Sequence, residues 1–208
     1  MESDVQPYKL SFTTGSQYCT ESVRIAEIYR RLGNWDEARE EALSTNVLQF
    51  RTASSGIRLF RELAQRLQML SDEQLDVLIE GSLDEQRKLL WFAICRRYRY
   101  IQEFAIEVVR EKYLTMDYEL TELDYDTFFH HKADWHPELE EIADTTRAKL
   151  RQVVFRMLRE SGIINEDNWI IPVQLSARLM DVLKEDAPQS LLIYPMPLDG
   201  LEDAVNHG

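Results

Sequence analysis

Arginine and hydroxyl side chains gather between residues 51 and 66, and these residue types together favour phosphate binding. Glu62 is the only acid among the four arginines there, which are Arg51, Arg58, Arg61 and Arg66. Residues 52–56 are rich in hydroxyls and fall at the expected start of a helix, where free N–H groups and the helix dipole attract anions. We predict a DNA- or phosphate-binding site composed of Arg51, Thr52, Ser54, Ser55, Arg58, Arg61 and Gln65.

Helical periodicity supports this site, but it leaves an alternative open. At 100° per residue, one face opposite the apolar stripe carries the polar residues Arg58, Arg61, Gln65 and Gln68. The alternative is ordinary N-capping by Ser54 or Ser55 beside a solvated arginine face.

A second basic set lies on a later helical pattern. Its five members have no acid among them, and they are Arg147, Lys149, Arg151, Arg156 and Arg159. One interpretation is a recognition helix for DNA. The other is a set of salt bridges to the acids that precede the helix.

Residues 117–144 form an acidic run, with ten acids and Lys132 as the only lysine or arginine. The simplest interpretation is a solvated face. The alternatives are a docking surface for a basic partner and electrostatic steering that keeps nucleic acid on the opposite side of the molecule.

Residue types that support catalysis or metal binding are present without a typical motif. Three of the four histidines fall within seven residues, in the cluster Asp126, His130, His131, Asp134 and His136. Adjacent helical side chains diverge by about 100°, so a solvated helix end is favoured over a metal site. Cys19 and Cys95 have no nucleophile signature and are expected as buried small hydrophobes. We therefore expect no catalytic residue, metal, cofactor or small-molecule substrate.

Composition narrows the class of protein further. The 208 residues carry 37 acids and 24 bases, a net charge of −13, which excludes a uniformly basic nucleic-acid binder but not a local basic patch. Two cysteines provide no disulfide framework, as is typical of the reducing cytoplasm. The most apolar stretch, Leu89–Ile94, is far shorter than the about 20 residues of a membrane span, and residues 1–6 lack a secretory signal. We expect a soluble, cytoplasmic protein.

The elements that must position these residues are helices. Apolar residues recur at helical spacing over residues 25–32, where Gly33 ends the helix, and Asn34 begins the next one, with Glu37 at the capping-box position. Further helices are predicted over residues 55–70, 83–113 with a break near 97–99, 117–129 and 137–158, and capping boxes are predicted at Ser71 and Ser82. The pattern predicts a mainly α-helical bundle.

The last part of the chain carries the only β-like pattern. Residues 163–171 predict a hairpin, 175–183 a helix and 191–194 an additional strand, an order that suggests a winged-helix variant. The tail over 199–208 is expected to fray. A soft domain boundary is predicted near Met116, because residues 1–113 have a net charge of −2 and 114–208 of −11; one continuous domain is the alternative.

The first third of the chain also resembles a known family, and the resemblance is most specific over residues 8–70. The family is BrxA, small accessory proteins of BREX bacteriophage-exclusion systems. The resemblance rests on Ser11-Phe12-Thr13-Thr14-Gly15, Glu21-Ser22, Asn34-Trp35, Asn46 through Ser55, and Arg58 through Glu62. It implies a cytoplasmic, non-enzymatic protein with a mainly helical, NusB-like fold that is associated with DNA.

Together, these observations predict a non-enzymatic, DNA-binding accessory component of an anti-phage defence system. Its expected partners are double-stranded DNA and other BREX proteins, and no membrane. The alternatives are a scaffold that binds no nucleic acid, and an RNA-binding protein.

Overall fold

The computed structural model describes residues 6–184 and 188–197, and within these ranges every regular element is a helix. The α-helices are α1 (Cys19–Leu32), α2 (Trp35–Ser44), α3 (Ala53–Leu67), α4 (Asp72–Glu80), α5 (Leu83–Arg97), α6 (Arg99–Phe104), α7 (Glu111–Leu114), α8 (Glu122–Ala133), α9 (Pro137–Glu140), α10 (Asp144–Glu160) and α11 (Ala177–Lys184). The 3₁₀ turns η1 (Ser11–Thr14) and η3 (Pro188–Ile193) and the π-helical turn η2 (Ala105–Arg110) complete them. The predicted mainly α fold is confirmed.

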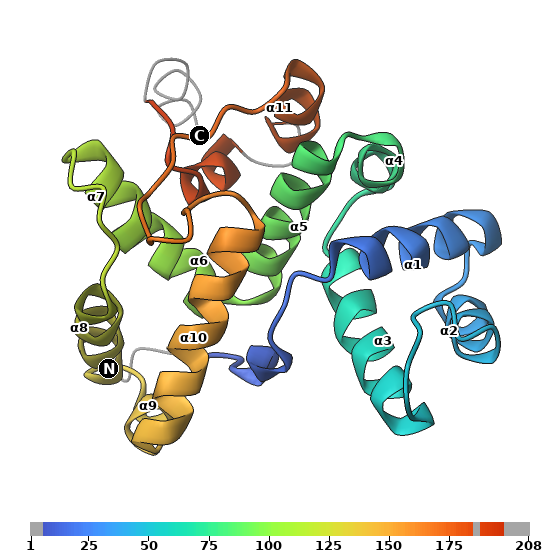
Figure 1. Ribbon diagram of the computed structural model, residues 1–208, viewed down its shortest axis with the longest axis horizontal. Helices are drawn as coiled ribbons and strands as arrows, with labels where there is room; N and C mark the ends of the chain where they lie inside the picture. Colours follow the sequence, from blue (N-terminus) through green and yellow to red (C-terminus); the bar gives the residue numbers. More distant parts are fainter. Residues whose placement is uncertain (1–5, 185–187, 198–208) are drawn as a thin grey trace.

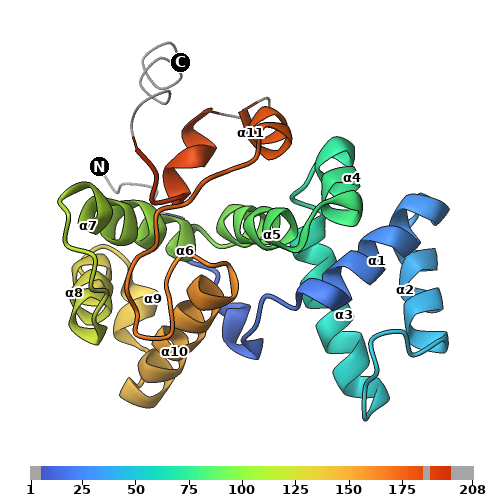
Figure 2. The ribbon, with the colours of Figure 1, turned by 45° about the horizontal axis from the view of Figure 1, so that its top comes forward.

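Helix α5 runs through the middle of the molecule (Figures 1 and 2). Helices α1–α4 lie at one end of it and α6–α10 at the other, with α11 and η3 along one side. Residues 88–95 of α5 are all buried, as expected for a helix that is apolar on every side. The apolar stretch Leu89–Ile94 therefore lies at the centre of the hydrophobic core.

Local signals account for most helix ends. Gly33 adopts φ +69° after α1, a conformation that suits glycine, and the Asn34 side chain accepts hydrogen bonds from Asp36 N and Glu37 N to begin α2. Both predicted capping boxes, at Ser71 and Ser82, are formed.

Three predicted helices are divided or shortened. The pattern over 83–113 breaks at Tyr98, close to the predicted place. The pattern over 137–158 does not form one helix: Glu140 ends α9, and extended Ala143 precedes α10. Helix α8 begins at residue 122 rather than 117, because residues 118–120 bond instead to residues 168–170.

The predicted hairpin is reduced to a single bridge. Ile164 pairs with Ile170, and Asn165 N donates to Trp169 O, but the pairing is too short to form a strand. A second bridge, Glu119 to Trp169, brings in a distant segment that the sequence pattern did not indicate.

The predicted strand over 191–194 is wrong, because residues 188–193 form η3 against α5 and η2. The predicted helix over 175–183 is present as α11. The winged-helix and NusB-like interpretations stay predictions, and the tail over 199–208 lies outside the described residues.

Core contacts cross the predicted boundary at Met116. Phe104 packs edge-on against Tyr125 and Phe128, with ring centroids 5.4 and 5.2 Å apart. The indole of Trp91 donates to Ile193 O at 3.2 Å. The division into two domains stays a prediction. Within the described ranges no helix has the length and apolar character needed to cross a membrane.

Candidate nucleic-acid interface

Thr52 is the N-cap residue of α3. Its side-chain oxygen accepts from Ser55 N at 3.3 Å, and its backbone is extended, as is typical of an N-cap residue. The expectation that Ser54 or Ser55 caps the helix is therefore wrong, since the cap lies earlier. Among the described residues nothing accepts from the N–H groups of Ala53 and Ser54, which remain available to an anion.

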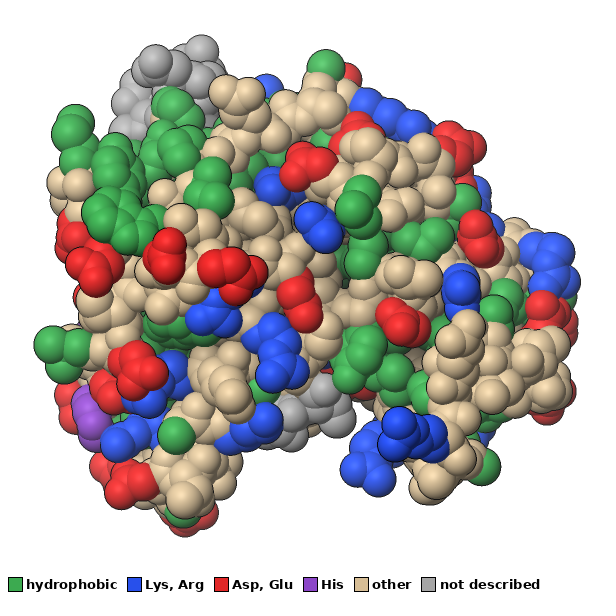
Figure 3. Space-filling model, viewed as in Figure 1, with side chains coloured by type: hydrophobic (Ala, Val, Ile, Leu, Met, Phe, Trp, Pro, Cys, Tyr) green, Lys and Arg blue, Asp and Glu red, His purple; other side chains and the backbone are tan. Residues whose placement is uncertain are grey.

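Three exposed arginines lie along the first half of α3: Arg51 precedes the helix, Arg58 lies in its second turn and Arg61 in its third. None of them forms a hydrogen bond or an ion pair within the part of the chain that the structure describes. Figure 3 shows basic side chains gathered at this end of α3. We call Arg51, Arg58 and Arg61 the α3 arginine cluster.

Arg66, the fourth arginine of the sequence pattern, is not part of this surface. Its side chain is buried and bonds to Glu62 at 2.9 Å and to Ser16 O at 2.8 Å. Tyr98 donates to the same Glu62 carboxylate, and burial and this contact raise the pKa of Tyr98 to about 12. Glu62 therefore neutralises Arg66 inside the protein and does not reach the α3 arginine cluster.

Gln65 is also engaged in the fold. Its side-chain oxygen accepts from Arg97 Nη2 at 2.6 Å, so this predicted site residue holds α3 against α5. Only its amide nitrogen is left to contact a ligand.

Two hollows of about 380 and 330 Å³ border α3 and meet at Ile57. Arg51 and Thr52 line the first, and Arg61 lines the second beside Arg39 and Asp36 of α2. Arg39 extends the basic surface, and the sequence analysis did not include it. The sequence does indicate an apolar side of α2, and Ala38 and Ala42 on it are buried, but it does not indicate that α2 lies beside α3, so only the tertiary structure reveals the position of Arg39.

The second basic set lies on α10, and α8 neutralises its first half. Arg151 contacts Glu122 at 2.7 Å and Asp126 at 2.9 Å, and Arg147 contacts Asp144 at 3.2 Å and Asp126 at 3.8 Å.

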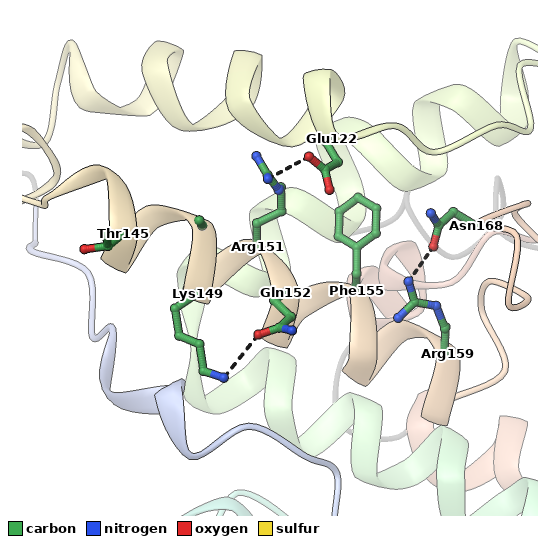
Figure 4. Close-up of a pocket in the computed structure, with 9 residues that line it drawn as sticks. Glu122, Thr145, Lys149, Arg151, Gln152, Phe155, Arg159 and Asn168 are labelled. Carbon is green, nitrogen blue, oxygen red and sulfur yellow. Dashed lines mark hydrogen bonds and ion pairs between the residues drawn. The ribbon is translucent and has the colours of Figure 1, made fainter.

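The rest of the set bonds to neutral oxygens, and Lys149 and Arg159 line a hollow of about 470 Å³ (Figure 4). Arg159 donates to Asn168, Lys149 to Gln152, and Arg156 to Gly15 O. The salt-bridge interpretation thus describes Arg147 and Arg151.

Part of the acidic run is structural rather than solvated. Glu138 accepts from Tyr8 N at 2.7 Å and contacts His136 at 3.0 Å, while Asp124 closes a capping box with Thr121. Glu140 and Glu141 are exposed.

The histidine cluster is spread over different environments. His136 is buried and stacks on Tyr8 with ring centroids 3.9 Å apart, whereas His130 contacts Arg147 and His131 is exposed. Over residues 6–184 and 188–197, no group of three histidine, cysteine or acidic side chains is arranged to hold a metal ion.

The two cysteines differ in burial. Cys95 is buried, which raises the pKa of its thiol well above the ordinary value. Cys19 is only partly buried, contrary to expectation; desolvation still raises the pKa of its thiol. Raised pKa values disfavour the reactive thiolate at both sites.

The fold and this surface define a mainly helical protein with an exposed arginine cluster at one helix start. A family model described as BrxA matches residues 6–187. The chain therefore belongs to the BrxA family of BREX anti-phage systems.

Named relatives agree with this family, and a solved structure shares the fold. The chain is 29% identical over 148 residues to "BREX protein BrxA" of Bacillus cereus, covering 71% of this chain and 74% of the relative. The protein of the same description from Paramagnetospirillum magneticum is 24% identical over 187 residues, 89% of this chain and 94% of the relative. A crystal structure of an uncharacterized protein from Magnetospirillum magneticum superimposes with a TM-score of 0.78 at 25% identity, covering 90% of this chain and 97% of that one.

Proposed function

We propose that this chain is a non-enzymatic, cytoplasmic component of a BREX system that binds double-stranded DNA through the start of α3. The observation that carries the proposal is the α3 arginine cluster, whose three guanidinium groups have no carboxylate partner among the described residues. Exposed arginines beside a helix N-terminus suit phosphate oxygens, which accept from guanidinium and backbone N–H groups alike.

The proposed contacts are to the DNA backbone rather than to base edges. Arg51, Arg58 and Arg61 lie around the end of a helix whose apolar side is buried, and hydroxyls of Thr52 and Ser54 lie at the same end. Such contacts position a protein on a duplex without reading its sequence. The proposal therefore predicts salt-sensitive binding with little sequence preference.

The net charge of −13 is compatible with this function because the charge is unevenly distributed. Helix α3 carries a single acid, Glu62, and that acid is buried against Arg66. Eleven of the net negative charges belong to residues 114–208. Acids elsewhere on the molecule repel DNA and orient it towards the α3 end.

The test is the double variant Arg58→Glu/Arg61→Glu, assayed by mobility shift over a range of salt concentrations. We expect affinity for duplex DNA to fall roughly tenfold or more at low salt, and the slope of log affinity against log salt to fall by about 2. Thermal unfolding should be unchanged, because both side chains are exposed.

The matched control is Arg178→Glu/Lys184→Glu, which makes the same change in net charge on α11, along another side of the molecule. Equal losses in the two double variants would show that net charge, not this surface, governs binding. Duplex DNA, single-stranded DNA and RNA of equal length distinguish the proposed ligand from RNA. Full affinity in the α3 variant would overturn the proposed site.

A further inference from the structure

A patch of exposed apolar side chains lies at the opposite end of the molecule from α3. Its members are Met116, Trp169 and Ile171, which are 78%, 50% and 41% exposed, and we call them the Trp169 patch. Figure 3 shows hydrophobic side chains grouped over the α7 end of the molecule, with acidic side chains along the border. Large apolar side chains gathered on one surface are typical of protein-binding sites.

Backbone pairing holds this patch in a fixed arrangement. Ile170 N donates to Tyr118 O at 2.7 Å, and Leu120 N donates to Asn168 O at 3.0 Å, so Glu119 lies opposite Trp169. Side chains of paired extended residues alternate between two faces. Ile170 and Leu120 point into the core, and Trp169, Ile171 and Glu119 therefore point outward.

Carboxylates border the patch, and several have no cation of their own. Glu119, Glu166 and Asp167 are exposed and form no ion pair within the described ranges. Lys112, the basic residue of the preceding helix, is held by Asp117 at 2.5 Å and Asp124 at 3.3 Å. Arg159 donates to Asn168 beside Trp169, so the three unpaired carboxylates outnumber this cation and the border of the patch is negative on balance.

We propose that the Trp169 patch docks a basic segment of another protein of the same BREX system, with an apolar side chain of that segment packed on Trp169. A tryptophan at the centre of an interface is a frequent site of large binding energy. The unpaired carboxylates favour a partner that brings lysine or arginine.

The negative charge around the patch also disfavours two other partners, a second copy of this chain and DNA. Two copies of this chain that meet through this surface bring Glu119, Glu166 and Asp167 of each copy together, which costs free energy. DNA is repelled by the same carboxylates. The proposal goes beyond the DNA-binding function and does not rest on it, because α3 contributes no residue to this patch.

The first test places the photoreactive residue p-benzoylphenylalanine at position 169 of the full chain, expressed together with the other proteins of its BREX system. We expect a discrete adduct with one of those proteins, through a peptide of net positive charge. The matched control carries the same residue at position 135, because Trp135 is also exposed, at 66%, but lies outside the patch. That control should give several-fold less adduct.

The second test measures the affinity of the purified chain for the cross-linked protein. Trp169→Ala should weaken binding about tenfold or more, as expected at an interface hot spot, and Trp135→Ala should have no effect. The triple variant Glu119→Lys/Glu166→Lys/Asp167→Lys should weaken it comparably. Ile171→Ala serves as a second apolar variant if Trp169→Ala lowers the thermal stability.

The proposal is overturned by an adduct with a second copy of this chain or with an acidic peptide, by the absence of a discrete adduct, or by full affinity of the Trp169→Ala and Ile171→Ala variants. DNA affinity should be the same in Trp169→Ala as in the unmodified chain. A negative result here therefore does not affect the α3 proposal, and full DNA affinity in the α3 variant, which would overturn that proposal, does not affect this one.

Discussion

The start of α3 and the outer face of α10 both carry clustered basic side chains, yet their surroundings differ. At α3, Arg58 and Arg61 are exposed and have no carboxylate partner in the described part of the chain. On α10, Arg147 and Arg151 are each held by two acidic side chains. The α3 region presents unpaired positive charge to solvent. On α10, Arg147 and Arg151 are paired with acids, whereas Lys149, Arg156 and Arg159 bond only to neutral oxygens within the described residues.

The difference comes from the neighbouring elements rather than from the basic helices themselves. Helix α8 presents Glu122 and Asp126 to α10, whereas α3 borders α2, whose Asp36 reaches only the groove beside Arg61. Paired charges contribute little to the field outside a protein. Helix α2 is itself acidic, but no acid of α2 forms an ion pair with Arg58 or Arg61 in the described ranges, and Glu41 pairs with Arg31 instead. A cluster of arginines in a sequence therefore predicts a basic surface only where the acids of neighbouring helices do not reach the arginines.

The largest expected effect comes from separating the two regions after Met116. A chain of residues 1–116 keeps α3 but loses the partners of Trp91 and Phe104, which pack against Ile193, Tyr125 and Phe128. We expect it to aggregate, because exposing large aromatic side chains is unfavourable. Size-exclusion chromatography and circular dichroism measure this. A soluble, helical monomer that binds DNA would instead establish two independent domains.

A smaller effect is expected from the buried end of α3. Glu62→Ala leaves the Arg66 charge buried without its carboxylate, and removing one partner of such a pair costs about 3–5 kcal/mol of unfolding free energy. Arg58→Ala, on the exposed end of the same helix, should change stability by about 0.5 kcal/mol or less.

Urea denaturation of the Glu62→Ala and Arg58→Ala variants measures both values. Similar losses in the two would mean that the arginines of α3 do not divide into internal and surface roles. The double variant Glu62→Leu/Arg66→Met should recover part of the loss, because it removes both charges together.

The sequence predicts helices better than it predicts their partners. Capping residues such as Ser71 and Ser82 bond within one helical turn, so a short stretch of sequence is enough to predict them. The burial of Arg66 and the role of Arg39 depend on helices distant in the chain, and so does the bridge between Glu119 and Trp169. The exposed α3 arginines were predictable from periodicity, but their lack of acidic partners was not.

Lowering the pH is expected to have an intermediate effect on thermal stability. The effect depends on an N-terminal segment that contacts both α3 and α10. This segment, residues 6–18, contacts Arg66 and Arg156 through backbone oxygens, and Tyr8 N donates to Glu138. Burial raises the pKa of Glu138, but hydrogen bonds from Tyr8 N and from its own N–H and contact with His136 outweigh it, so the pKa lies below the ordinary value.

Because folding lowers this pKa, Glu138 stabilises the protein above its unfolded-state pKa of about 4.3, and that contribution is lost as the pH falls through the folded-state pKa. Between pH 6 and pH 3, the thermal midpoint of the unmodified chain should therefore fall about 2–4 °C further than that of Glu138→Gln, the size of about one such hydrogen bond. Calorimetry measures the difference. Parallel curves would show that Glu138 does not anchor the segment.

The smallest expected effect tests whether α8 masks the basic face of α10. Glu122→Gln/Asp126→Asn keeps side-chain shape and removes both acidic partners of Arg151 and the more distant of the two partners of Arg147, which keeps Asp144. If masking explains the difference between the two regions, this variant should bind DNA about threefold more tightly at low salt, where screening is weakest.

The matched control, Glu140→Gln/Glu141→Gln, makes the same change in net charge at exposed carboxylates with no ion-pair partner in the described ranges. Mobility shifts at equal ionic strength compare the two. A larger gain in the Glu122/Asp126 variant means that released arginines contact DNA, whereas equal gains mean that only long-range repulsion has changed. No gain in either would mean that DNA bound at α3 lies beyond the reach of both acidic groups, since the Debye length is about 30 Å at about 0.01 M salt.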